Sequence, residues 1–85
     1  MTLTMLYFAW VRERIGLGEE RIEVPPGVTT IGGLIEWLAA RGQGYAQAFA
    51  DPTRLRAALD QRFVPLETVI GQAREVAIFP QVTGG

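Results

Sequence analysis

Three chemically versatile amino acids are missing from this chain: cysteine, histidine and lysine do not occur among its 85 residues. Without cysteine there is no disulfide, thiolate nucleophile or cysteine-ligated metal. Without histidine the usual general base is missing, and without lysine there is no side-chain amine for Schiff-base or isopeptide chemistry. Nine acidic residues remain, but scattered carboxylates more often serve solvation. The composition therefore predicts a protein that is not a stand-alone enzyme and that binds no metal or cofactor of its own.

The chain also lacks an excess of charge and a long apolar run. The chain has eight arginines and nine acidic residues, and its net charge of −1 does not indicate the basic surface that nucleic-acid binding requires. There is no leader peptide and no apolar run of about 18 residues, so we expect neither a membrane nor a secretory route but a cytoplasmic protein. A chain of 85 residues suffices for one domain and leaves little core to enclose a private substrate pocket.

Apolar patterning and chain breakers predict five strands. They are expected at residues 3–10, 20–24, 55–59, 62–64 and 75–80. Residues 11–18 are expected to form a charged turn with at most one helical turn. Asp60-Gln61 is expected to form the tight reversal between the third and fourth strands.

One main helix is predicted between the second and third strands. Its apolar stripe consists of Ile31, Leu34, Ile35 and Leu38. Thr29 or Thr30 is the expected N-cap, and the helix is expected to run to Arg41, with Gly42 as a left-handed C-cap. A second short helical segment is expected at residues 45–50.

The predicted element order, β-β-α-β-β-β, is that of the ubiquitin-like β-grasp. The predicted class is α+β, with a mixed five-stranded sheet packed on one main helix. Residues 1–80 form the expected domain, and residues 81–85 form an extended tail that ends in Gly-Gly.

The sheet face away from the helix is predicted to carry an aromatic patch. Val64, Val76 and Ile78 suit the helix-covered face, so alternation turns Phe63 and Phe79 outward. Phe8 is expected to join them, because the first and last strands of a β-grasp sheet are neighbours. We interpret Phe8, Phe63 and Phe79 as a surface that docks a partner protein. The alternative is that other segments bury some of these rings in the monomer.

The tail offers chemistry of a different kind. Gly84 and Gly85 lack a Cβ, so a narrow tunnel can close around them. Five extended residues from Gln81 reach about 17 Å beyond the sheet. Another enzyme could then attach a leaving group such as AMP to the terminal carboxylate, for a sulfur or amine nucleophile to displace. The alternatives are a chance glycine pair and an idle flexible end.

The motifs at both ends resemble the MoaD family, the small subunit of molybdopterin synthase. Leu6-Tyr7-Phe8-Ala9, Arg12-Glu13 and Gly16 are similar to the family pattern LYFA-x-x-RE-x-x-G. Residues 75–80 (EVAIFP) and 82–85 (VTGG) are similar to its closing pattern, EVA-hydrophobic-FPP-V-[ST]-GG. The resemblance covers the whole chain.

This resemblance implies a role as a sulfur carrier. An E1-like adenylating enzyme of the MoeB type would activate Gly85 with ATP, and a sulfurtransferase route would convert it to a thiocarboxylate. The large subunit, MoaE, would supply the catalytic residues, receive Gly84 and Gly85 in a pocket, and pass sulfur to cyclic pyranopterin monophosphate. The family interface implies partner contacts by Phe8, Phe63, Phe79, Pro80, Val82 and Thr83. It also implies a heterotetramer of two large and two small subunits.

The sequence departs from the family pattern at three places. Leu59-Asp60 replaces Val-Asn, Ala73-Arg74 replaces Gly-Asp, and Gln81 replaces the second proline of FPP. We expect the turn at Asp60 to survive, the loop before residue 75 to be rebuilt, and the tail to be slightly more flexible at its root. Arg12 and Glu13 are interpreted as a local ion pair, with contact to a partner enzyme as the alternative.

Three other functions share some of these features. The thiamin sulfur carrier, ThiS, has the same fold and Gly-Gly tail but lacks the RE-x-x-G motif. A ubiquitin-like modifier would be conjugated to lysines through the tail. A pure interaction module would leave the tail idle.

Overall fold

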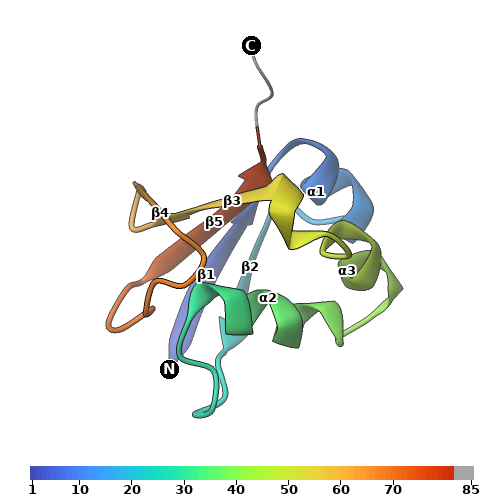
Figure 1. Ribbon diagram of the computed structural model, residues 1–85. Coiled ribbons are helices and arrows are strands. Elements are labelled where there is room, and N and C mark those ends of the chain that lie inside the picture. Colours follow the sequence, from blue (N-terminus) through green and yellow to red (C-terminus); the bar gives the residue numbers. More distant parts are fainter. Residues whose placement is uncertain (82–85) are drawn as a thin grey trace.

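A computed structural model describes residues 1–81 of the chain as a five-stranded mixed sheet with helices packed on it (Figure 1). The sheet order is β2-β1-β5-β3-β4. The strands are β1 Thr2–Tyr7, β2 Glu19–Glu23, β3 Leu55–Leu59, β4 Arg62–Val64 and β5 Glu75–Pro80. The helices are α1 Ala9–Ile15, α2 Ile31–Ala39, α3 Gln43–Ala48 and the short 3-10 helix η1 Pro52–Arg54. Over residues 1–81, no helix has the length and apolar character needed to cross a membrane.

The last strand in sequence lies in the middle of the sheet. β5 pairs in parallel with β1, from Thr4↔Glu75 to Tyr7↔Ile78. On its other edge β5 pairs antiparallel with β3, from Leu55↔Pro80 to Leu59↔Val76. The α+β class and the β-grasp arrangement predicted from the sequence are therefore confirmed, and β5 has the predicted bounds.

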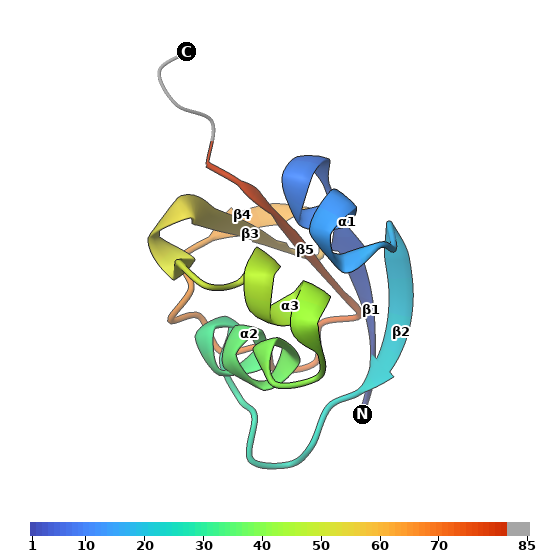
Figure 2. The same cartoon turned by 90° about the vertical axis from the view of Figure 1, so that its right-hand side faces the viewer.

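The core lies between the sheet and α2, and Figure 2 shows α2 and α3 side by side on one face of the sheet. The predicted stripe of α2 is fully buried, and Val76 and Ile78 of β5 are buried against the helices. The Thr30 side chain accepts a hydrogen bond from the Gly33 amide at 3.1 Å, which confirms it as the N-cap of α2.

The first strand is shorter than predicted, because residues 8–10 leave the sheet. Phe8 is still extended, but Ala9 has φ of 53° and turns the chain into α1. Val11 is fully buried on this helix, and Gly16 ends it in the left-handed conformation. Burial of Val11 outweighs the β propensity of this aromatic segment, so the prediction of a strand through Trp10 was wrong.

The connection after α2 also differs from the prediction. The helix ends at Ala39, and Gly42 is an extended N-cap of α3 rather than a left-handed C-cap of α2. Tight bonds close the end of α2, from the Arg41 amide to the Leu38 carbonyl and from the Ala40 amide to the Trp37 carbonyl. Because these bonds satisfy the last carbonyls, no left-handed residue is needed. Helix α3 corresponds to the second short helical segment predicted at residues 45–50, whereas α1 is longer than the single turn expected there and η1 was not predicted.

The reversal at Asp60-Gln61 is confirmed. Both residues have positive φ, 47° and 72°, as a tight hairpin turn requires. The Asp60 side chain also accepts hydrogen bonds from the amides of Arg74 and Glu75, at 2.9 and 3.0 Å. The carboxylate therefore fixes the start of β5 as well as the turn.

A half-buried carboxylate, Glu20, joins the sheet to α3. One of its oxygens accepts hydrogen bonds from the hydroxyls of Tyr7 at 2.8 Å and Tyr45 at 2.6 Å, and the other lies 3.4 Å from Arg41. Burial, followed by the hydrogen bond to Glu20, raises the pKa of Tyr45 to about 12 and raises that of Tyr7 further in the same direction. Both hydroxyls therefore stay protonated as donors to this carboxylate.

These contacts predict a loss of stability at alkaline pH. The folded-state pKa of Tyr45 is raised from 10.0 to about 12, so its stabilising contribution is complete below pH 10 and is lost as the pH rises towards 12. The chain has no lysine or cysteine, so the two tyrosines are the only side chains expected to titrate there. Urea unfolding between pH 8 and 12 should show the decline above pH 10. A Tyr45→Phe variant should decline less steeply, and equal slopes in the two proteins would contradict the assignment.

Close packing of α1 on α3 depends on Gly44. A Cβ at this position would lie 2.6 Å from the Arg14 carbonyl oxygen, which belongs to the rigid backbone of α1. By contrast, a Cβ at Gly32 in α2 would meet only the Leu66 carbonyl oxygen, at 3.4 Å.

We therefore predict opposite effects of two matched substitutions. Gly44→Ala should lower the free energy of unfolding by about 1–3 kcal/mol, because α1 and α3 must move apart. Gly32→Ala should leave it unchanged or raise it by up to about 1 kcal/mol, because alanine favours the helix. Denaturant titration of both variants measures the difference. A stabilised Gly44→Ala protein would show that α1 can yield at this contact.

Candidate functional site

The candidate site begins where the central strand β5 ends, next to α1. Val82, Thr83, Gly84 and Gly85, which the sequence predicts as the working tail, lie outside the described residues. The structure does describe the two residues that lead into this tail, Pro80 and Gln81, which we call the tail root. Pro80 closes β5, and the Gln81 amide donates a 2.8 Å hydrogen bond to the Arg54 carbonyl.

The Gln81 side chain also contacts the segment beside it. With its amide oriented so that both ends find partners, the nitrogen lies 3.2 Å from the Thr53 carbonyl and the oxygen lies 3.1 Å from Arg56 Nη2. The residue that replaces the second proline of the family pattern is thus bonded through its backbone and its side chain. The sequence predicted a more flexible root, and these bonds act against that flexibility.

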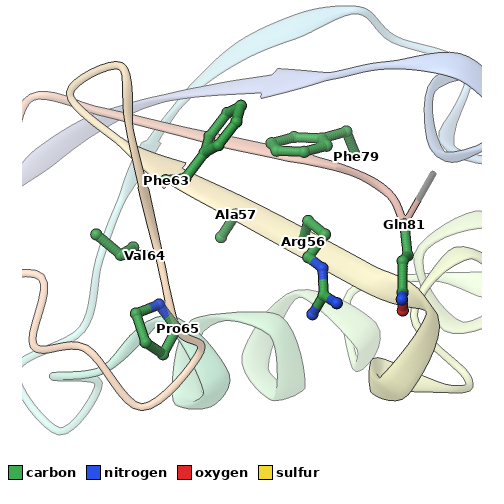
Figure 3. Close-up of a pocket in the computed structure, with 7 residues that line it drawn as sticks. All are labelled: Arg56, Ala57, Phe63, Val64, Pro65, Phe79 and Gln81. Atoms are coloured by element: carbon green, nitrogen blue, oxygen red, sulfur yellow. The ribbon is translucent and has the colours of Figure 1, made fainter.

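Two of the three predicted aromatic residues lie together on the sheet face opposite α2. Phe63 of β4 is 84% exposed, and Phe79 of β5 is partly exposed. Their ring centroids are 5.6 Å apart at an interplanar angle of 48°, a favourable tilted arrangement. Both rings line a groove of about 590 Å³ (Figure 3). The other lining residues are Arg56, Ala57, Val64, Pro65 and Gln81.

Phe8, the third predicted member, is not among the residues that line this groove. It precedes α1 as its N-cap, and its side chain is 48% exposed. Within residues 1–81 the structure records no ring contact from Phe8 to Phe63 or Phe79, and Phe8 does not line the groove. The Phe8 amide still donates a 3.3 Å hydrogen bond to the Ile78 carbonyl, one residue before Phe79, and the chain leaves the sheet at Ala9. The Phe63–Phe79 pair is therefore the part of the predicted patch for which the structure records a ring contact.

A second aromatic feature at the tail root was missed from the sequence. The Trp10 ring has the Arg14 guanidinium 4.4 Å from its centroid and the Arg54 guanidinium 5.2 Å away. Trp10, Arg54, Pro80 and Gln81 line a hollow of about 230 Å³. The spacing of four between Trp10 and Arg14 would have indicated this contact had the helix been predicted. Arg54 is distant in sequence, so no local pattern could have added it.

The predicted ion pair between Arg12 and Glu13 is not found. In the part of the chain that the structure describes, the ion pairs are Met1 with Glu23 and Arg41 with Glu20. Adjacent residues on a helix do not face each other, and Arg12 instead packs beside Gly18. The contact that fixes the end of α1 is the bond from the Gly16 amide to the Arg12 carbonyl.

Comparison with known proteins places the chain in a family. A family model described as the ThiS family matches residues 5–85, so the match reaches the terminal glycines. The chain belongs to the ThiS family. Three curated proteins that are similar to the chain are named molybdopterin synthase sulfur carrier subunit, and two of them come from Haemophilus influenzae and Mycobacterium tuberculosis.

Both relatives are similar to this ThiS-family chain over nearly their whole length. The Haemophilus influenzae protein is 36% identical over 83 residues, which cover 98% of this chain and 99% of the relative. The Mycobacterium tuberculosis protein is 38% identical over 84 residues, which cover 98% and 96%. The solved structure of SAMP1 from Haloferax volcanii covers both chains fully with a TM-score of 0.71 at 21% identity, which confirms the ubiquitin-like fold. The resemblance to the synthase small subunit is also confirmed.

The exposure of Phe63 predicts that this ring contributes little to folding. Phe63→Ser should lower the free energy of unfolding by about 1 kcal/mol, because the exposed ring loses only its contact with Phe79. Phe49→Ser is the matched control, because Phe49 is 4% exposed and packs against Tyr7. That control should lose several kcal/mol or fail to fold. An equally damaging Phe63→Ser change would mean that the ring belongs to the core.

Proposed function

We propose that this protein is the sulfur carrier subunit of a molybdopterin synthase. The observation that carries the proposal is the identity of 36% and 38% to two such subunits over nearly the full length of each. The match of the family model through Gly85 supports a working C-terminus. The fold adds that the strand leading to this tail is held on both edges, by β1 and β3.

The proposed chemistry takes place at the carboxylate of Gly85. An E1-like enzyme of the MoeB type joins this carboxylate to the AMP part of ATP, and pyrophosphate leaves. The persulfide sulfur of a sulfurtransferase then attacks the acyl carbon and displaces AMP, and a thiol reductant cleaves the S–S bond of the resulting acyl disulfide to leave a thiocarboxylate. The loaded tail donates its sulfur to cyclic pyranopterin monophosphate, and two such donations build the dithiolene of molybdopterin.

In this scheme the chain binds and presents the sulfur, while the large subunit, MoaE, performs the catalysis. The Phe63–Phe79 groove is the proposed docking surface for that subunit, since exposed aromatic rings beside polar residues are typical of interface centres. Phe8 extends the contact from the start of α1. Pro80, Val82 and Thr83 lead the tail into the pocket of the partner, and Gly84 fits its narrow part.

Intact-mass measurement tests the proposal. The protein is incubated with ATP, an adenylating enzyme and a sulfur source, and should gain the mass of one oxygen-to-sulfur replacement. Deletion of Gly85 should abolish this gain while the thermal unfolding midpoint stays unchanged, because the tail lies beyond β5. No mass gain under conditions that load a known MoaD protein would overturn the proposal.

Two further measurements separate the alternatives. Conversion of the pyranopterin precursor by the loaded protein with MoaE distinguishes molybdenum cofactor synthesis from thiamin synthesis. A Gly-Gly remnant on lysines of other cellular proteins would instead identify a ubiquitin-like modifier.

A further inference from the structure

The tail root carries a cationic cluster that the proposed chemistry does not use. The Arg14 guanidinium lies 4.4 Å from the Trp10 ring centroid, and that of Arg54 lies 5.2 Å from it. The two positive charges are therefore at most about 10 Å apart, close to the screening length at 0.1 M salt. The aromatic ring attracts each cation and so restricts both long side chains.

Neither arginine forms an ion pair within residues 1–81, where the two ion pairs involve other residues. Glu13 is adjacent to Arg14 in α1, but adjacent helical residues do not face each other. Asp51 is the acidic residue near Arg54. Hydrogen bonds from Thr53 are the main reason why its pKa is lowered, and the charge of Arg54 contributes least. The Asp51 carboxylate accepts these hydrogen bonds from the Thr53 amide and hydroxyl, at 3.1 and 2.6 Å.

The cluster is continuous with the root of the tail. Trp10 and Arg54 share a hollow with Pro80 and Gln81, the last two residues before the undescribed tail. The Gln81 amide is bonded to the Arg54 carbonyl, so this arginine is fixed next to the departing chain. A protein that encloses the tail as far as Gln81 brings the rim of its opening against this hollow.

We propose that Arg14 and Arg54, held on Trp10, bind acidic side chains at the rim of the tail-receiving opening in the large synthase subunit. This inference rests on the proposed function, and it names the chemistry of the partner surface. Carboxylates suit two ordered guanidinium groups because Arg–carboxylate bonds are charge-assisted and directional. A ring that already orders both arginines reduces the side-chain entropy that binding would otherwise cost.

Charge reversal tests the inference in the full chain. Association with the purified large subunit is followed by stopped-flow fluorescence at low and at physiological ionic strength. Arg14→Glu and Arg54→Glu should each slow association about tenfold at low salt and weaken its salt dependence. Arg54→Lys should retain most of the rate, because it keeps the charge.

Arg74→Glu is the matched control, since Arg74 is exposed and precedes β5 at the end away from the tail. It makes the same change in net charge and should leave the rate nearly unaltered. Thermal unfolding of each variant verifies that these exposed changes preserve the fold.

The other outcomes overturn specific claims. If Arg54→Glu and Arg74→Glu associate equally fast, the cluster does not bind the large subunit and the inference is wrong. An effect confined to the adenylating enzyme also overturns it, because the acidic surface would belong to a different protein. If the unaltered chain does not bind the large subunit at all, the proposed function fails and this inference with it.

Discussion

The parallel pairing of β1 with β5 is the contact on which the rest of the structure depends. It joins the first and last strands, and the β1–β2 and β3–β4 hairpins have no other connection within the sheet. It also sets which side chains face α2, so that Val76 and Ile78 enter the core while Phe79 faces away. The same pairing brings the end of β5 beside the start of α1. The tail root and the Trp10 cluster therefore depend on this pairing, whereas the aromatic groove depends on the pairing of β5 with β3 and of β3 with β4.

Much of this fold could be predicted because its signals are local. The α2 stripe, its Thr30 cap, the Asp60-Gln61 turn and the bounds of β5 each depend on neighbouring residues. Helix α1 could not be predicted in the same way. Its aromatic residues favour a strand, and the helix is stabilised by Val11 in a core that only the complete fold creates. Gly42 was predicted to end α2 but precedes α3 instead, because a glycine between two helices suits either the end of the first or the start of the second.

The candidate site was predictable in its chemistry and less so in its geometry. Alternation along β4 and β5 correctly turned Phe63 and Phe79 outward, because strand periodicity is a backbone property. The prediction placed Phe8 in the same patch because it extended the first strand through Trp10, but β1 ends at Tyr7, one residue before Phe8. Arg54 reaches Trp10 across more than half of the chain, and such a contact leaves no trace in local spacing. By contrast, the absence of cysteine, histidine and lysine and the presence of a Gly-Gly end can be read directly from the sequence.

The central position of β5 also constrains when the molecule can fold. During synthesis β5 is the last strand to leave the ribosome, although it fills the gap between β1 and β3. Until then both neighbours present unpaired edges, and only the two hairpins can form. During synthesis the contacts that are most distant in sequence therefore form last, and contacts of this kind slow folding because the chain must close a long loop before they form. A chain that stops before β5 cannot form the complete sheet. Every folded copy therefore contains the strand from which the tail departs.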